Sequence, residues 1–297
     1  SKDFSNLIAV NLDAVFDPSI LQEHGSWIFR QEGWRLEKRY QKYPNKEAQY
    51  RFNGVVLETQ KGAYSDPDLS IHKYAHRALF PDTQYNYDNS GLPEEIVSVT
   101  RASLIEYHQK YYHPSNAQVF LYGPLEDVTE GLKQVDDYVS AYDLNEDVRE
   151  NSSPKWQDKI NKENSPREIH EYASTLENGD YRVMMSWLIN DRVMDAKTEI
   201  AWRMLNYLLI QSPTSILRKV LEYSGAGREV IGGGLKSDLL QWTFNVGMKG
   251  VRSDDVETVE DIITDALNEI LQNGGFNDEE LQAAFNSVEF QLTDHAT

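Results

Sequence analysis

Residues 100–124 read Thr-Arg-Ala-Ser-Leu-Ile-Glu-Tyr-His-Gln-Lys-Tyr-Tyr-His-Pro-Ser-Asn-Ala-Gln-Val-Phe-Leu-Tyr-Gly-Pro. Thr100 is a typical helix N-cap, and it predicts a helix from Arg101 to Tyr112 that Pro114 ends. The apolar run that follows, Ala117 to Tyr122, predicts a short buried strand. Helix, turn and strand in this order indicate a chain that mixes both kinds of secondary structure.

The same mixture extends along the rest of the chain. Helical periodicity and strand-like alternation succeed one another, which predicts the α+β class with antiparallel-rich sheets and helices packed on them. The expected helices cover 6–15, 55–64, 71–80, 128–142, 196–209, 216–223, 254–271 and the residues after 277; the expected strands cover part of 27–43 and residues 168–173, 181–189, 229–235 and 240–251.

Composition excludes several classes of protein. The 297 residues carry 29 Lys and Arg against 48 Asp and Glu, a net charge of −19, which argues against a nucleic-acid binder. Cysteine is absent, so thiolate zinc sites and a cysteine nucleophile are excluded. No apolar run approaches the ~18 residues of a membrane span. The chain starts without Met and stops within a helical pattern, so we expect both ends to be cut ends.

A polar stretch from 143 to 166 predicts a linker, because it is rich in Ser and Asn and is punctuated by Pro154 and Pro166. The pattern of strands and helices restarts after it. We therefore predict one domain over residues 1–142 and a second over residues 167–297.

His72 and His76 form the most conspicuous local motif. Two histidines four residues apart share one face of a helix, as zinc-binding pairs do. Zincin motifs place a glutamate between the two histidines, and here the intervening residues are Lys73, Tyr74 and Ala75. An ordinary packed helix is the favoured interpretation, with an independent metal-binding module as the weaker alternative.

Gly232-Gly233-Gly234 has the composition of a phosphate-binding loop, but it lacks the Lys-Ser/Thr ending of a P-loop. A glycine-rich bend or bulge within a sheet is the favoured interpretation. The acidic residues of 254–260 and 278–280 lie where helices begin, which predicts solvated first turns rather than an acid/base pair. No catalytic residue and no metal ligand is assigned from local motifs.

Several longer strings resemble the presequence-protease branch of the pitrilysin-type zinc peptidases, the inverzincins. The most specific is Tyr107–Ala117, which contains Tyr-Tyr-His-Pro-Ser-Asn-Ala. The others follow in order along the chain: Leu12–Phe16, Gln31–Trp34, Gly54–Val56, Lys61–Ser65, Pro213–Leu221, Gly247–Val251 and Asn286–Phe290.

The resemblance implies pairs of related α+β domains that enclose a chamber for unfolded peptides. On this reading residues 1–142 are the later part of a first peptidase-like domain, and residues 167–297 are a second domain of the inactive type. The inverted zinc motif His-x-x-Glu-His is absent from this sequence, and we expect it upstream if it exists. Zinc is therefore expected only with a complete site in a longer protein.

The resemblance also places the third zinc ligand, a glutamate, on the helix that follows Gly54. The alignment puts Thr59 at that position and Glu58 one residue before it. A shift of one residue turns a helical side chain by ~100°, so Glu58 is not a simple replacement. Thr59 lies outside the usual ligand set of imidazole, thiolate and carboxylate.

The leading hypothesis is a non-catalytic portion or degenerate member of this family, which shapes the chamber or serves as a structural subunit. The alternative is a fragment of an active zinc endopeptidase of short unfolded or targeting peptides, with Glu58 as a shifted ligand. Expected partners are unfolded basic peptides and the remaining parts of the same protein or assembly. The resemblance implies a mitochondrion or a plastid as the compartment.

Overall fold

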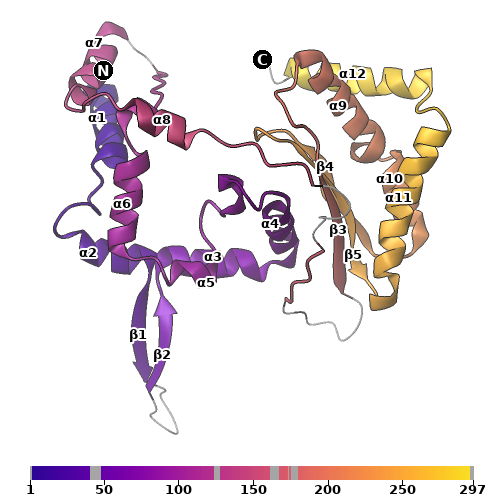
Figure 1. The fold of residues 1–297 in the computed structure, drawn as a ribbon, viewed down its shortest axis with the longest axis horizontal. Helices are drawn as coiled ribbons and strands as arrows, with labels where there is room; N and C mark the ends of the chain where they lie inside the picture. The colour runs from indigo at the N-terminus through magenta and orange to yellow at the C-terminus, as the bar shows by residue number, and fades with distance from the viewer. Residues whose placement is uncertain are drawn as a thin grey trace. The chain divides into compact units, whose positions relative to one another are not determined.

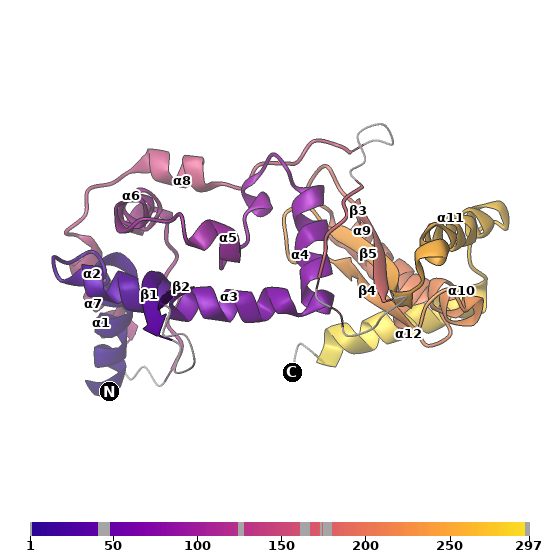
Figure 2. The ribbon, with the colours of Figure 1, turned by 90° about the horizontal axis from the view of Figure 1, so that it is seen from below.

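The computed structural model describes residues 2–40, 48–123, 128–160, 167–172, 174 and 180–294. These residues form two compact units (Figures 1 and 2). Unit 1 comprises Ser1–Tyr64 and Asn89–Ser153, and unit 2 comprises Ser65–Asp88 and Pro154–Thr297. Residues 65–88 thus leave unit 1 in the middle of its sequence and belong to unit 2. The predicted domain limits at 142 and 166 stay a prediction.

Unit 1 is mainly helical. Its elements are α1 (Lys2–Phe16), α2 (Gly25–Ile28), the π-helix η1 (Phe29–Gly33), β1 (Arg35–Tyr40), β2 (Ala48–Asn53), α3 (Val55–Ser65), α5 (Pro93–Ile96), α6 (Arg101–Tyr111), the 3-10 turn η3 (Pro114–Asn116), α7 (Val128–Val139) and α8 (Glu146–Ser152). Helix α8 lies inside the stretch that was predicted to be a linker.

A small core joins α1 to α7. Ile8, Leu12 and Phe16 lie on one stripe of α1 and are buried together. Leu7 and Val10 lie on another apolar stripe of the same helix, and both side chains are more than half exposed. The two stripes are both apolar, so periodicity alone could not distinguish them.

The predicted helix after Thr100 is confirmed. The Thr100 hydroxyl accepts a hydrogen bond from the N–H of Ser103, and the Ser103 side chain accepts one from the N–H of Thr100, which completes a capping box. The strand predicted for 117–122 is wrong for this chain. These residues form no strand, and Phe120 and Tyr122 are 86% and 87% exposed.

The two-stranded hairpin β1–β2 projects from the helices of unit 1 (Figure 1). Its antiparallel register pairs Leu36 with Phe52 and Lys38 with Tyr50, so these four side chains share one face. Leu36, Phe52 and Tyr50 are between 42% and 63% exposed. The hairpin therefore presents an apolar face to solvent.

Unit 2 is a three-stranded antiparallel sheet with helices on it. Its elements are α4 (Pro67–Leu79), the 3-10 turn η2 (Gln84–Asn86), β3 (Tyr181–Leu188), α9 (Ala196–Asn206), the π-helix η4 (Tyr207–Gln211), α10 (Ile216–Ser224), β4 (Glu229–Lys236), β5 (Thr243–Val251), the 3-10 turn η5 (Ser253–Asp255), α11 (Val256–Gln272) and α12 (Asp278–Asp294). The strand order is β3-β5-β4, with both pairs antiparallel. The α+β class with antiparallel sheets is confirmed.

The main core lies between this sheet and α10 and α11. Strand β5 alternates: Phe244, Val246 and Met248 are buried in the core, whereas Thr243 and Asn245 point to the other face. In Figures 1 and 2, α10 and α11 lie on one side of the sheet and α4 lies on the other. The sheet of unit 2 is therefore covered on both faces.

Helix α4 is fastened to the sheet by ion pairs. It begins at Pro67, four residues before the predicted start, because Asp66 caps it and proline suits the first helical position. The Asp68 carboxylate accepts hydrogen bonds from Arg182 Nε at 2.7 Å and from Lys249 Nζ at 3.0 Å. These bonds join the first turn of α4 to β3 and β5.

The strand predicted over Glu168–Ala173 is also wrong, since residues 168–172 form none, and Ala173 lies outside the described residues. Side chains hold this segment instead. His170 stacks on Tyr74 of α4 with ring centroids 3.6 Å apart. Arg182 of β3 donates a hydrogen bond to the Tyr172 hydroxyl. Residues 175–179, between this segment and the expected strand from Tyr181, lie outside the described residues.

Candidate functional site

The helix that was expected to carry a zinc ligand is α3. It begins after Gly54, where a side chain would collide with the backbone of Gly33. Leu57 and Gln60 are its buried positions, and Glu58 and Thr59 are both exposed. The helix thus forms where predicted, with its two candidate ligands on the solvent side.

Both candidate ligands already have partners. The Thr59 hydroxyl donates a hydrogen bond of 2.9 Å to the Val55 carbonyl oxygen. The Glu58 carboxylate accepts a 3.0 Å hydrogen bond from Lys61 Nζ and lies 3.6 Å from Arg51 Nη2. The hydrogen bond from Lys61, with the positive charges of Lys61 and Arg51, lowers the pKa of Glu58 below its ordinary value.

This donor set does not fit a zinc ion. A catalytic zinc needs three protein ligands from the imidazole, thiolate and carboxylate set. Thr59 belongs to none of these classes, and Glu58 is neutralised by two cationic side chains. Within the described parts of the chain, no three His, Cys, Asp or Glu residues gather closely enough to hold a metal ion.

His72 and His76 lie on α4 and are half-buried within unit 2. Burial and the nearby Lys236 lower the pKa of both imidazoles. The ring of His76 packs 4.8 Å from that of Phe80 and 6.4 Å from that of Tyr85, centroid to centroid. The nearby Lys236 repels a metal ion, and His76 packs against aromatic rings as an ordinary partly buried side chain does, so this geometry favours the packed-helix interpretation.

The glycine run is a sheet irregularity, as predicted. The pairing of β4 with β5 shifts register between Ile231 and Gly234. Gly232, Gly233 and Gly234 have φ values of 110°, 76° and 80°, which L side chains rarely adopt. A Cβ on Gly232 would meet the Asn245 carbonyl oxygen at 2.5 Å. The run therefore permits a bulge and a close backbone approach.

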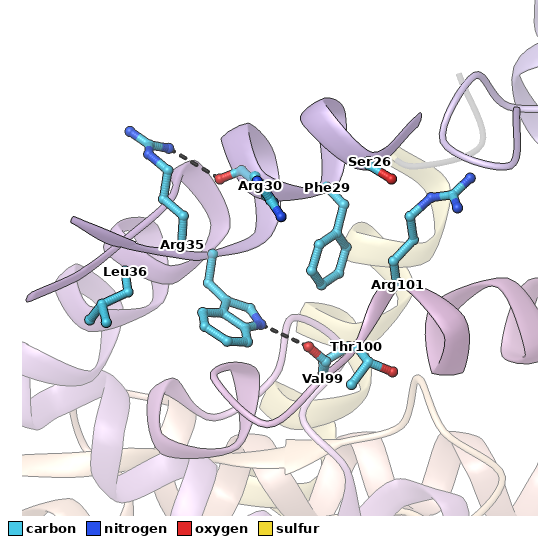
Figure 3. A pocket seen from close by; sticks show the side chains of 9 residues that line it. Ser26, Phe29, Arg30, Arg35, Leu36, Val99, Thr100 and Arg101 are labelled. Carbon is cyan, nitrogen blue, oxygen red and sulfur yellow. Dashed lines mark hydrogen bonds between the residues drawn. The ribbon is translucent and has the colours of Figure 1, made fainter. Parts of the chain in front are cut away.

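Unit 1 holds an open pocket of about 580 Å³ that local motifs did not reveal. Its walls come from the α2–η1 segment, the start of β1 and the start of α6 (Figure 3). The nine lining residues are Ser26, Phe29, Arg30, Trp34, Arg35, Leu36, Val99, Thr100 and Arg101.

The pocket combines an aromatic wall with cationic groups. Phe29 and Trp34 both line it, and the Trp34 indole N–H donates a 2.8 Å hydrogen bond to the Val99 carbonyl oxygen. Arg35 donates to the Arg30 carbonyl oxygen and pairs with Glu37. These bonds fix the aromatic wall and one of the guanidinium groups.

The third guanidinium group, of Arg101, joins the start of α6 to the loop that follows α1. It donates hydrogen bonds to the backbone carbonyl oxygens of Ile20, Leu21 and Gln22, at distances between 2.7 and 3.2 Å. These acceptors are neutral, so the positive charge of Arg101 is not cancelled by them. An arginine directly after an N-cap gives no sequence signal for this role, which explains why it was missed.

The chemistry available in this pocket is binding. Its nine lining residues include no histidine and no carboxylate, and the Thr100 hydroxyl caps α6. General acid/base catalysis needs a titratable group near the working pH, and arginine does not supply one. The pocket is suited to an apolar side chain, with positive charge at its edge.

The family model for the peptidase M16 inactive domain matches residues 98–288. Presequence protease 1 of Arabidopsis thaliana, named chloroplastic/mitochondrial, is 34% identical over 100% of this chain. Protein HypA of Clostridium perfringens is 33% identical over 98%, and the mitochondrial presequence protease of Mus musculus is 32% identical over 98%. The chain spans only 27% to 29% of the length of these relatives.

Among solved structures, a peptidase M16 inactive domain from Pseudomonas fluorescens matches with a TM-score of 0.51 and 15% identity. The match covers 80% of this chain and 54% of that one. At this identity the similarity concerns the fold. No helix in the described ranges has the length and apolar character needed to cross a membrane.

Proposed function

The chain belongs to the peptidase M16 inactive-domain family, and from this membership we propose that it forms a non-catalytic wall of a peptide-enclosing chamber in a presequence-protease-like protein. It would contact unfolded peptides without cleaving them. Because the chain spans less than a third of its curated relatives, this role concerns its part in a longer protein.

The arrangement around Thr59 carries the proposal. Thr59 stands where the resemblance calls for a zinc-binding carboxylate, and its hydroxyl is bonded to the Val55 carbonyl oxygen. The neighbouring carboxylate, Glu58, is held by Lys61 and Arg51. A metal at this site would have to displace two cations from Glu58 and would gain nothing from Thr59.

Charge supports a peptide as the bound species. The chain has a net charge of −19, and such a field attracts basic, unfolded segments. The pocket of Figure 3 supplies an aromatic wall for an apolar side chain of the same peptide. Its arginines make it a poor place for the basic side chains, which we expect to bind elsewhere on the acidic surface.

The names of the relatives bear on the compartment. The Arabidopsis relative is named chloroplastic/mitochondrial and the mouse relative is named mitochondrial, whereas the clostridial relative comes from a bacterium. We propose a mitochondrion or a plastid for this chain, as its resemblance to the organellar presequence proteases suggests.

The alternative is a portion of an active zinc endopeptidase. One observation favours it: Glu58 offers an exposed carboxylate on α3, one position before Thr59. A local change in helix register would be needed to bring this carboxylate to the ligand position. Loss of its bonds to Lys61 and Arg51 would accompany that change.

Peptide binding and peptide cleavage can be measured separately. A fluorescent, lysine- and arginine-rich unfolded peptide is mixed with the 297-residue chain and with the complete product of its gene. Anisotropy reports binding, and mass spectrometry reports cleavage with and without a zinc chelator. We expect salt-sensitive binding to both and cleavage by neither.

Matched variants make the outcome specific. Glu58→Gln removes the candidate carboxylate, and Glu106→Gln removes an exposed carboxylate from α6 as a control. Chelator-sensitive cleavage that Glu58→Gln abolishes and Glu106→Gln preserves would establish the active alternative. Failure of the peptide to bind either protein would exclude the chamber-wall role.

A further inference from the structure

The pocket of Figure 3 lies in a basic part of an acidic chain. Residues 30–61 supply four of its nine lining residues, and they carry eight lysines and arginines against four glutamates, whereas the whole chain has a net charge of −19. The lining itself holds three arginines and no carboxylate. A local positive potential of this kind attracts an anionic group that the rest of the surface repels.

One of the three guanidinium groups is already neutralised. Arg35 donates hydrogen bonds from Nε and Nη2 to the Glu37 carboxylate, and from Nη1 to two backbone carbonyl oxygens. All three of its nitrogens are therefore occupied, and its charge is paired. Arg35 shapes the pocket but has little to offer a ligand.

The other two arginines keep free donors. Arg101 uses Nε and Nη2 for the carbonyl oxygens of residues 20–22, and within the described parts of the chain neither its Nη1 nor the guanidinium of Arg30 donates a hydrogen bond. In the same residues Thr83 Oγ1 is the only buried polar side-chain atom without a partner, so Arg101 Nη1 is open to solvent. Charged N–H donors of this kind bind a carboxylate more strongly than neutral donors do.

The same pocket has a fixed apolar wall. Phe29 and Trp34 line it and are only half-buried, which leaves ring surface for a ligand. The bond to the Val99 carbonyl oxygen holds the indole, and Phe52 of β2 packs edge-on against it with ring centroids 5.6 Å apart. An aromatic wall that is already fixed binds a large apolar side chain with little further loss of conformational freedom.

The last residue of a peptide matches both parts of this pocket. In an extended chain, successive side chains point to opposite sides. An internal acidic residue would therefore bring its carboxylate to the pocket and turn the apolar side chain of its neighbour away. At the C-terminus, the carboxylate and the side chain are attached to one Cα atom. A single terminal residue thus presents a negative charge and an apolar group to the same place.

We propose that this pocket binds the free C-terminal residue of an unfolded peptide, with the carboxylate at the free donors of Arg30 and Arg101 and a large apolar side chain against Phe29 and Trp34. The inference rests on the proposed peptide-binding role and adds to it a preference for one end of the peptide. A basic peptide fits this arrangement, because its lysines and arginines precede the terminal residue and can bind the acidic surface.

Amidation of the peptide tests the carboxylate directly. The basic peptide is labelled at its N-terminus, ends in phenylalanine and is made as the free acid and as the C-terminal amide. Anisotropy titrations of the 297-residue chain and of the complete gene product should both show at least about 10-fold tighter binding of the free acid. The net charge of −19 alone would favour the amide, which is the more positive peptide, so the expected order is diagnostic. A free acid that ends in alanine should bind about 10-fold more weakly than the one that ends in phenylalanine.

A matched pair of arginines tests the position of the carboxylate. Arg30→Gln removes an exposed guanidinium from the pocket, and Arg39→Gln removes an exposed one from β1 that does not line it. The two variants therefore change the net charge equally. The preference for the free acid should fall below about threefold in Arg30→Gln and stay unchanged in Arg39→Gln. Arg101 is left in place, because its bonds to residues 20–22 support unit 1.

The remaining outcomes also decide the question. Equal binding of acid and amide would overturn this proposal and leave the peptide-binding role intact, whereas failure of every peptide to bind would remove both. A preference that survives Arg30→Gln, or equal binding of peptides that end in phenylalanine and alanine, would place the terminal residue elsewhere and overturn the proposal.

Two further results would assign the pocket differently. A preference seen in the 297-residue chain and absent from the complete gene product would show that other parts of the protein cover the pocket, which overturns the proposal. Displacement of the peptide by decanoate, with no effect of amidation, would identify a fatty-acid carboxylate as the ligand and overturn it as well.

Discussion

The hydroxyl of Thr59 donates a 2.9 Å hydrogen bond to the carbonyl oxygen of Val55, one helical turn earlier. This bond turns the side chain back onto its own helix instead of outward to a ligand. A glutamate at the same position would project its carboxylate beyond the helix surface. The residue at this one position of α3 thus decides whether the helix can offer a carboxylate ligand there, although a zinc site needs two further ligands.

Zinc binding is the first prediction. The wild-type chain, Glu58→Gln and Thr59→Glu should each retain well below one zinc ion per chain after dialysis. Thr59→Glu adds one carboxylate, but one ligand is not enough where three are needed. Elemental analysis by mass spectrometry measures the zinc content. One ion per chain that is lost in Glu58→Gln would contradict the prediction, and retention that is lost in His72→Ala would point to α4 instead.

The attachment of α4 gives the second prediction. Asp68→Asn should lower the free energy of unfolding of unit 2 by about 1 kcal/mol, because it weakens two charge-assisted bonds that are partly exposed. Glu199→Gln is the control, since it breaks one exposed ion pair within α9, with Arg203, and should cost at most about 0.5 kcal/mol. Urea unfolding followed by tryptophan fluorescence measures both. Equal losses would show that α4 is not held by Asp68.

The pH dependence of unit 2 is the third prediction. Burial first, and then Lys236, lowers the pKa of His72 and His76 below the ordinary 6.5. Asp68 opposes the shift at His72, and the Tyr85 backbone, Asp238 and Asp88 oppose it at His76. The folded state therefore binds fewer protons than the unfolded state. The free energy of unfolding should therefore be independent of these two histidines above about pH 6.5, and it should fall as the pH drops below that value.

The double variant His72→Gln, His76→Gln should flatten this dependence between about pH 7.5 and about pH 5.5. The control His24→Gln changes an exposed histidine of unit 1 and should leave the slope as it is. Urea midpoints at the two pH values provide the comparison. An unchanged slope in the double variant would assign the pH dependence to other groups.

The core of unit 2 gives the fourth prediction. Leu221→Ala should lower the free energy of unfolding by about 2–5 kcal/mol, because Leu221 is fully buried between α10 and the sheet. Leu271→Ala changes a leucine of α11 that is 78% exposed, and it should cost about 0.5 kcal/mol or less. Both are measured by urea unfolding at neutral pH. Similar losses would mean that this core is loosely packed.

Sequence patterns correctly predicted those helices and bulges whose defining residues are close together in the chain. The cap at Thr100, the amphipathic helix α11 and the bulge at Gly232–Gly234 follow from neighbours in sequence and were predicted correctly. The strand at 117–122 was not, because β-rich composition specifies a strand only when a second strand is present to pair with it. Burial on α1 depended on where α7 packs, which no local pattern contains.

In the candidate site too, the positions within one helix were predicted, whereas the contacts made between distant segments were not. Alignment with a known pattern placed Thr59 and Glu58 on one helix, and the structure has them there. The partners of Glu58 were not predicted, since Arg51 comes from β2 and reaches the carboxylate through tertiary structure. The pocket was missed for a related reason, because Trp34 and Val99 are 65 residues apart in sequence.

The excursion of residues 65–88 into unit 2 has a consequence for how this protein can be divided. The peptide chain passes between the two units three times, after Tyr64, after Asp88 and after Ser153. Removing everything beyond Ser153 would leave α4 without the strands that anchor Asp68. A single cut or a simple gene fusion therefore cannot exchange either unit as a module, and a chimera would need three junctions to transfer one of them.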